Sequence, residues 1–153
     1  MDSESLVMTF SYINEKYAVS PQLEIKDLPA ITAAGFTRII CNRPDEEVAE
    51  PQKAQVFRLE AEKVGIEFFE LPLVYGNMTP TKVNEQRTLI EQANGSVLAY
   101  CASGTRSTVI WALGEAASGI EVSETLSATQ RAGYDLTKMR ETLQCAFDAG
   151  QKS

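Results

Sequence analysis

Short apolar runs rich in β-branched residues alternate along the chain with longer segments whose apolar residues recur every three to four positions. The runs predict strands at residues 17–20, 37–42, 66–73 and 96–100. The segments between and after them have helical periodicity. Strands that alternate with helices are typical of a parallel sheet covered by helices on both faces. The pattern therefore predicts an α/β domain with a central, parallel-type sheet of about four strands flanked by helices.

Residues with strong end preferences mark where the predicted helices begin and end. Thr79 suits the N-cap and Pro80 the first helical position of a helix that runs to about Ala93. Gly35 and Gly65 suit the positions that follow two earlier helices. The predicted helices cover about 24–34, 52–64, 80–93, 106–119, 123–132 and 135–149, with Ser123 and Asp135 as the N-caps of the last two.

Length and charge narrow the function classes. A chain of 153 residues is long enough to bury a core, so we expect residues 1–153 to form one domain. The net charge is −7, from 14 basic and 21 acidic residues. This balance disfavours nucleic acid and anionic membrane surfaces as partners, because both attract basic patches.

The first residues and the cysteines bear on the compartment. The chain begins with neither a positive segment nor an apolar one, so we expect no secretory signal. No apolar stretch approaches the roughly 20 residues that a membrane-spanning helix needs. The three cysteines, Cys41, Cys101 and Cys145, are an odd and widely spaced set, which disfavours a disulfide framework. We therefore expect a cytoplasmic protein in a reducing compartment.

The lack of histidine limits the chemistry further. With no imidazole in the chain, Ser-His-Asp and Cys-His machinery and the usual zinc sites are excluded. No cluster of side chains resembles a metal site, and no cofactor is expected. Any cysteine chemistry must obtain its thiolate without an imidazole partner.

The segment 101–107 carries the strongest chemical signal. An apolar strand delivers Cys101 to the carboxyl edge of the sheet, where ligands of open α/β folds bind. Small residues follow, so successive backbone N–H groups can turn inward, and the next helix points its positive N-terminus at the same spot. Features of this kind lower the pKa of a thiol. We therefore expect a reactive thiolate in an anion-binding loop.

The arginine of this loop completes the expected anion cradle. Arg106 presents a planar fork that matches two oxygens of a phosphate-like group. Ser107 is expected to donate a hydrogen bond to the thiolate or to a leaving sulfur. The predicted anion-binding set is Ala102, Ser103, Gly104, Thr105 and Ser107, with Arg43 as a second clamp.

Several other residues have both a functional and an ordinary interpretation. Asp45 is a candidate general acid, or a solvated turn residue after a proline. Arg43 is a second anion clamp, or a loop cation paired with neighbouring acids. Tyr75 lines the substrate pocket or packs on the surface. Cys41 and Cys145 are expected to pack in the core, with resolution of an oxidised Cys101 as the alternative for Cys145.

Five separated segments resemble the phosphatase-like domain of the β-lactamase-hydrolase-like family. They are residues 17–23, 27–28, 34–36, 42–45 and 101–107, and the likeness extends over about 10–147. The resemblance implies a fold like that of dual-specificity cysteine phosphatases. Two departures stand out: Ala102 occupies a position where the family often has arginine, and only four residues separate Cys101 from Arg106. That shorter spacing resembles the loop of rhodanese sulfurtransferases.

Three functions remain open from the sequence. The first is a cysteine-dependent phosphatase in which Cys101 attacks phosphorus. The second is a sulfurtransferase that carries a persulfide on Cys101, and the third is a non-catalytic anion-binding module. The segment 72–80, where a phosphatase would be expected to carry its general acid, contains no acidic residue, so Asp45 is the best substitute. The expected partner is a small anion: a phosphate ester, or thiosulfate or a persulfide.

Overall fold

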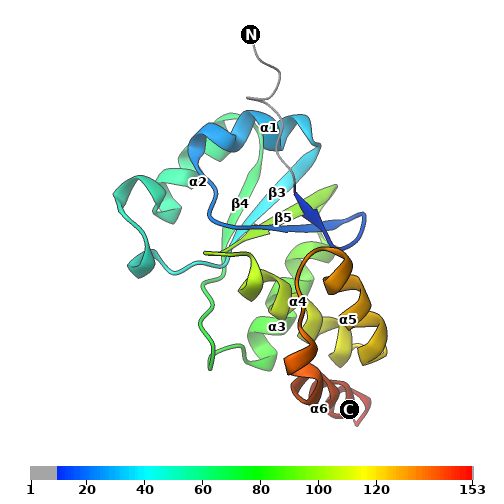
Figure 1. Cartoon of the computed structure of the whole chain (residues 1–153). Coiled ribbons are helices and arrows are strands. Elements are labelled where there is room, and N and C mark those ends of the chain that lie inside the picture. Colours follow the sequence, from blue (N-terminus) through cyan, green and yellow to red (C-terminus); the bar gives the residue numbers. More distant parts are fainter. Residues whose placement is uncertain (1–9, 153) are drawn as a thin grey trace.

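A five-stranded sheet forms the centre of the molecule (Figure 1). The computed structural model describes residues 10–152. Within them the strand order is β1-β2-β5-β3-β4, and every pair is parallel except β1 with β2. The strands are β1 (Ser11–Tyr12), β2 (Tyr17–Ser20), β3 (Phe36–Cys41), β4 (Glu67–Glu70) and β5 (Ser96–Tyr100). The predicted α/β architecture with a largely parallel sheet is confirmed.

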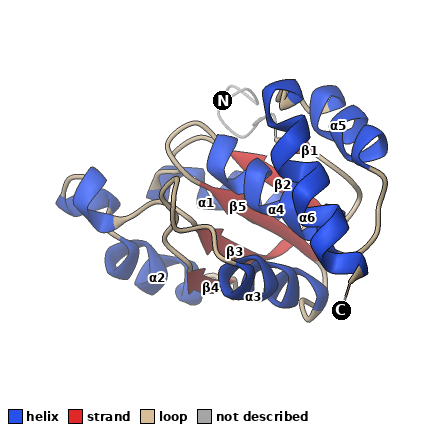
Figure 2. Cartoon of the chain, turned by 90° about the horizontal axis from the view of Figure 1, so that it is seen from below, coloured by secondary structure: helices blue, strands red, loops and turns tan. Residues whose placement is uncertain are grey.

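Helices cover both faces of the sheet (Figure 2). Alternate residues of β5 point to opposite sides: Val97 and Ala99 belong to one core, and Leu98 and Tyr100 to the other. The second core is closed by α1 (Leu28–Ala33) and α2 (Ala54–Lys63). The first is closed by α3 (Pro80–Glu91), α4 (Thr105–Ala117), α5 (Val122–Arg131) and α6 (Arg140–Gln151).

Short 3-10 helices lie in the connections between these elements. They are η2 (Ile25–Asp27), η3 (Asp45–Glu47), η4 (Glu50–Gln52) and η5 (Thr137–Met139). Two of them split predicted helices: residues 24–34 form η2 followed by α1, and residues 135–149 form η5 followed by α6. The η3 helix lies in the loop that leaves β3, and this loop contributes to the site described below.

The helix ends show where local signals succeed and where they fail. Thr79 caps α3 as predicted, since its hydroxyl accepts a hydrogen bond from the backbone N–H of Lys82 (3.3 Å). The prediction for Ser123 was wrong, because α5 begins one residue earlier with Glu121 at the N-cap. Asp135 instead accepts from the backbone N–H of Thr137 (3.0 Å), which opens η5 rather than α6.

The sheet also differs from its predicted outline at two edges. The short strand β1 was not predicted, because two residues carry no measurable period. The predicted strand 66–73 ends as a strand at Glu70. Beyond it, Leu71 and Leu73 still donate backbone hydrogen bonds to Cys41 and Asn42 (both 2.9 Å), so the segment continues alongside β3.

Candidate active site

Cys101 follows the central strand of the sheet directly. β5 lies between β2 and β3, so Cys101 emerges at the carboxyl edge with parallel neighbours on both sides. Its backbone N–H donates to the carbonyl of Ser20 on β2 (3.4 Å). The residue is fully buried, at the base of the loop that leads into α4.

The loop after Cys101 curls back over the sulfur. Gly104 has a φ of +94°, the left-handed region that glycine reaches without a steric penalty. Its backbone N–H donates to the Sγ of Cys101 (3.1 Å). Gly104 is also the N-cap of α4, so the positive end of the helix faces the same sulfur. The Gly104 N–H and the start of α4 thus lie on the same side of the Cys101 sulfur.

The other small residues of the loop hold its outer turn. The hydroxyl of Ser103 donates to the hydroxyl of Thr105 (2.9 Å) and accepts from the backbone N–H of Thr105 (3.3 Å). The carbonyl of Ala102 accepts from the backbone N–H of Gln22 (3.3 Å). The loop is therefore tied to the connection that follows β2.

The guanidinium of Arg106 is held by an acidic residue that comes from another loop. Nη1 and Nη2 donate to the two carboxylate oxygens of Glu47 (2.8 and 2.7 Å), and Nη1 also donates to the carbonyl of Leu73 (2.8 Å). These bonds use three of the five N–H groups of the guanidinium. The Nε–H and the other N–H of Nη2 form the adjacent edge of the guanidinium, where Cys101 is a further side-chain partner of Arg106. An edge of this shape matches two oxygens of an anion.

The ion pair between Glu47 and Arg106 shifts the pKa of each partner in the direction that favours its charged form. The hydrogen bond from Arg106 holds the pKa of Glu47 below its usual 4.5, with a further contribution from Arg43. Glu47 in turn raises the pKa of Arg106, and the nearby Cys101 sulfur adds to the rise. Beside Arg106, Glu47 therefore keeps its negative charge to a lower pH than an isolated glutamate does.

Arg43 and Asp45 lie on the same loop as Glu47, and the side chains of both bind other groups of the protein. Arg43 donates to the Glu47 carboxylate (3.1 Å) and to the side chain of Gln22 (3.1 Å). The Asp45 carboxylate accepts from the backbone N–H of Ala54, the first residue of α2 (2.9 Å). Arg43 thus joins the Glu47–Arg106 pair, whereas the Asp45 side chain holds the start of α2.

A buried polar network supports the loop from below. The Ser107 hydroxyl donates to the side-chain oxygen of Asn42 (2.8 Å). Asn42 and Gln86 exchange side-chain hydrogen bonds (2.9 and 3.2 Å), and Gln86 also donates to the hydroxyl of Tyr17 (3.0 Å). That hydroxyl donates to the backbone carbonyl of Ser107 (2.7 Å), and burial raises its pKa, so it stays protonated. The Ser107 proton is thus directed at Asn42 in this arrangement.

Two tyrosines lie near the sulfur. Burial raises the pKa of Tyr134, and the charge of Cys101 is the next cause. The same two causes raise the pKa of Tyr75, which is an exposed residue of the loop between β4 and α3.

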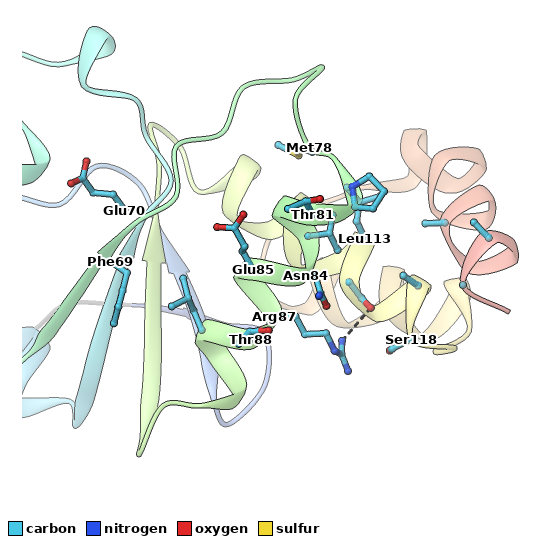
Figure 3. Close-up of a pocket in the computed structure, with 18 residues that line it drawn as sticks. Phe69, Glu70, Met78, Thr81, Asn84, Glu85, Arg87, Thr88, Leu113 and Ser118 are labelled. Carbon is cyan, nitrogen blue, oxygen red and sulfur yellow. Dashed lines mark hydrogen bonds between the residues drawn. The ribbon is translucent and has the colours of Figure 1, made fainter. Parts of the chain in front are cut away.

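A groove of about 1100 Å³ lies elsewhere, between α3, α4 and α6 (Figure 3). Arg87 crosses it and donates to the carbonyl of Gly114 (3.1 Å). None of its lining residues belongs to the cysteine loop. Across residues 10–152, no three His, Cys, Asp or Glu side chains form a cluster suited to a metal ion. No helix in that range is both long and apolar enough to cross a bilayer.

Comparison with known proteins places this geometry in a family. The model of the family described as "Beta-lactamase hydrolase-like protein, phosphatase-like domain" matches residues 9–118. The chain belongs to this family. A β-lactamase hydrolase-like protein of Agrobacterium fabrum is 32% identical over 126 residues, and one of Xylella fastidiosa is 29% identical over 125. The aligned part is 81% of this chain but only 29% of each relative.

Solved structures place the fold among the cysteine phosphatases. A candidate phosphatase from Neisseria meningitidis is 35% identical, with a TM-score of 0.80 over 88% of this chain and 96% of that one. PTPMT1 has a TM-score of 0.73 over 94% of this chain and 97% of its own, at 14% identity, which speaks for the fold alone. The predicted resemblance and fold class are confirmed.

Some residues of the site were not predicted from the sequence. Glu47, Gln86 and Tyr17 are not among the residues predicted for the site. Gln86 did leave a signal: it shares the inward face of its helix with Val83 and Ile90, where a polar residue needs a buried partner. No local pattern distinguishes Glu47 from its acidic neighbour Glu46.

Proposed function

We propose that this protein is a cysteine-dependent phosphatase whose nucleophile is the Cys101 thiolate. The observation that carries the proposal is the arrangement around one sulfur atom. The Gly104 N–H and the N-terminus of α4 point at it, and Arg106, from the first turn of α4, is a side-chain partner of the same sulfur. The phosphatase-like family and fold are the supporting context.

In the proposed reaction the Cys101 sulfur attacks the phosphorus of a phosphate ester. A sulfur–phosphorus bond forms while the bond from phosphorus to the leaving oxygen breaks. The loop amides and the Arg106 guanidinium stabilise the charge on the non-bridging oxygens. Water then attacks the thiophosphoryl intermediate, which releases inorganic phosphate and regenerates the thiolate.

The leaving oxygen needs a proton unless it belongs to a stable anion such as a phenolate. Asp45 is the proposed donor, because it lies on the loop after β3 that also carries Arg43 and Glu47. To act, its carboxyl group must exchange the hydrogen bond to Ala54 for one to the substrate. Aryl phosphates, which depart without a proton, are therefore the substrates of choice for a first assay.

The loop spacing favours a second candidate function, sulfur transfer. Four residues separate Cys101 from Arg106, so the amide ring is small and suits a persulfide sulfur, whereas a tetrahedral phosphate needs a wider ring. In that reaction the thiolate attacks the outer sulfur of thiosulfate, a persulfide forms on Cys101, and sulfite leaves with the electron pair of the broken sulfur–sulfur bond. No proton donor is required.

Intact mass spectrometry and phosphate release together test the two candidates. The reduced protein and a Cys101→Ser variant are incubated separately with an aryl phosphate and with thiosulfate. The phosphatase proposal expects phosphate release that is lost in the variant. Phosphate release that survives in Cys101→Ser contradicts it, and a gain of one sulfur that needs Cys101, without any phosphate release, replaces it with sulfur transfer.

A further inference from the structure

Tyr134 contacts the cysteine loop from a segment outside the residues matched by the family model. Its hydroxyl donates to the backbone carbonyl of Ser103 (2.9 Å). The match to the family ends at residue 118, whereas Tyr134 lies between α5 and η5. A hydrogen bond to this carbonyl acts on the peptide unit that joins Ser103 to Gly104, whose N–H is the group that faces Cys101.

The phenol of Tyr134 also fills the space beside Gly104. A Cβ built on Gly104 would lie 2.9 Å from the Cζ of Tyr134, and closer still to its hydroxyl oxygen. Real side chains do not approach this closely, so Tyr134 and a glycine at position 104 fit each other. The left-handed φ of Gly104 and the neighbouring phenol therefore act on the same peptide unit.

The backbone of Tyr134 is itself held by the end of α5. Gly133 adopts a φ of +101°, and its N–H donates to the carbonyl of Gln130 (3.0 Å). The N–H of Tyr134 donates to the carbonyl of Thr129 (2.9 Å). This pair of bonds is the Schellman motif, which fixes the direction in which the chain leaves a helix. The tyrosine is thus presented to the loop by a well-anchored turn.

From these contacts we infer that Tyr134 is a positioning residue for the reactive cysteine. It holds the Ser103–Gly104 peptide unit so that the Gly104 N–H stays directed at the Cys101 sulfur and at an anion bound above it. The raised pKa of Tyr134 keeps its hydroxyl protonated, as a donor requires. The inference rests on the proposed function only in taking Cys101 as the reactive thiol, and it holds for phosphoryl and sulfur transfer alike.

Alkylation of Cys101 by iodoacetamide tests this role without requiring turnover. The extent of modification at Cys101 is followed by peptide mass spectrometry from pH 5 to 9, because Cys41 and Cys145 also carry thiols. The same reaction is repeated with increasing sulfate, which protects a thiol beneath an oxyanion site. Tyr134→Phe is compared with the wild type and with Tyr12→Phe, which removes the hydroxyl of an exposed tyrosine on β1.

We expect two changes in Tyr134→Phe. The midpoint of alkylation should move to higher pH, with a proton concentration lower by a factor of about three to ten. The sulfate concentration that gives half protection should rise by a similar factor. Tyr12→Phe should match the wild type. An unchanged midpoint and unchanged sulfate protection in Tyr134→Phe would overturn the inference, whatever the protein does with phosphate esters. Failure to release phosphate with these shifts intact would count against the proposed function alone.

A second comparison separates positioning from a general loss of structure. Gly104→Ala places a methyl group where the phenol lies, so it should shift the same two readouts. Tyr134→Phe should then change the alkylation midpoint and the sulfate protection less in the Gly104→Ala background than it does alone. The reason is that both substitutions loosen the same Ser103–Gly104 peptide unit. Effects that multiply independently would contradict the inference, and a parallel thermal unfolding curve reports any change in overall stability.

Discussion

Two loops leave adjacent strands at the same edge of the sheet and divide the work of the site between them. The loop after β5 carries Cys101, Gly104 and, at the start of α4, Arg106, so the reacting groups lie within six consecutive residues. The loop after β3 carries Asn42 and Glu47, which hold two residues of the first loop by hydrogen bonds.

The difference between the loops concerns how each is specified. In the first, small residues, a glycine with positive φ and a helix N-terminus act on atoms a few residues away. In the second, Glu47 acts on a residue 59 positions later in the chain and Asn42 on one 65 positions later. Under the proposed function, the first loop supplies the reacting groups and the second holds them in alignment.

Among the substitutions outside Cys101, removal of the Arg106 side chain should have the largest effect on the proposed phosphatase activity. We expect Arg106→Ala to lower kcat/KM for an aryl phosphate by about 10²–10³-fold, because an anion in the loop loses its charged fork. Arg58→Ala is the matched control, since Arg58 pairs with Glu70 on β4. Equal activity of Arg106→Ala and wild type would mean that the first loop does not bind the anion through Arg106.

Loss of Asn42 should have the next largest effect, and on stability as well as activity. Asn42→Ala removes the buried hydrogen bonds that Asn42 makes with Ser107, Gln86 and the carbonyl of Leu71, so we expect a loss of about 2–4 kcal/mol in the free energy of unfolding. Chemical denaturation measures it. Ser107→Ala removes one member of the network and should cost less. If it costs as much as Asn42→Ala, the second loop is not the centre of the network.

Neutralising Glu47 tests alignment without removing bulk. Glu47→Gln retains the length of the side chain but not its charge, so Arg106 is held less firmly, and we expect about a tenfold fall in kcat. Glu46→Gln, on the same 3-10 helix, is the control. A variant with full activity would show that the ion pair is incidental to catalysis.

The same ion pair makes a prediction about pH. The folded pKa of Glu47 is lowered, so its contribution to stability is fully present above its usual value of 4.5 and is lost as the pH falls through the folded pKa. Denaturation measures the free energy of unfolding of wild type and Glu47→Gln at pH 7 and in steps below pH 4.5. The difference between the two proteins should become smaller as the pH falls. A difference that grows instead would contradict a lowered pKa of Glu47 in the folded protein.

The smallest effect is expected from Asp45→Asn with an aryl phosphate. The asparagine oxygen can still accept from Ala54, so the fold should be unchanged, and a phenolate leaves without a proton. With an alkyl phosphate we expect a loss of about tenfold or more, because the proposed proton donor is gone. A loss that is equal for both substrates would exclude a role for Asp45 as general acid.

Much of the fold followed from local patterns. The apolar run at 96–100 predicted β5 with its observed bounds, and Thr79 with Pro80 predicted the start of α3. Predictions failed where the pattern was too short, as at β1, and where the start of a helix was misplaced, as at Ser123. β1 is defined by its pairing with β2, and the N-cap of α5, Glu121, makes no side-chain cap hydrogen bond that a local signal would mark.

By itself the sequence determined an α/β fold, a cysteine at the end of an apolar strand and a loop of small residues followed by arginine. Periodicity and spacing encode these features, since each depends on residues close together in the chain. Only the tertiary structure decided that Glu47 rather than Glu46 holds Arg106, that Asn42 directs Ser107, and that Tyr134 reaches Ser103. These contacts join segments 31 to 65 residues apart, and packing around the sheet brings them together.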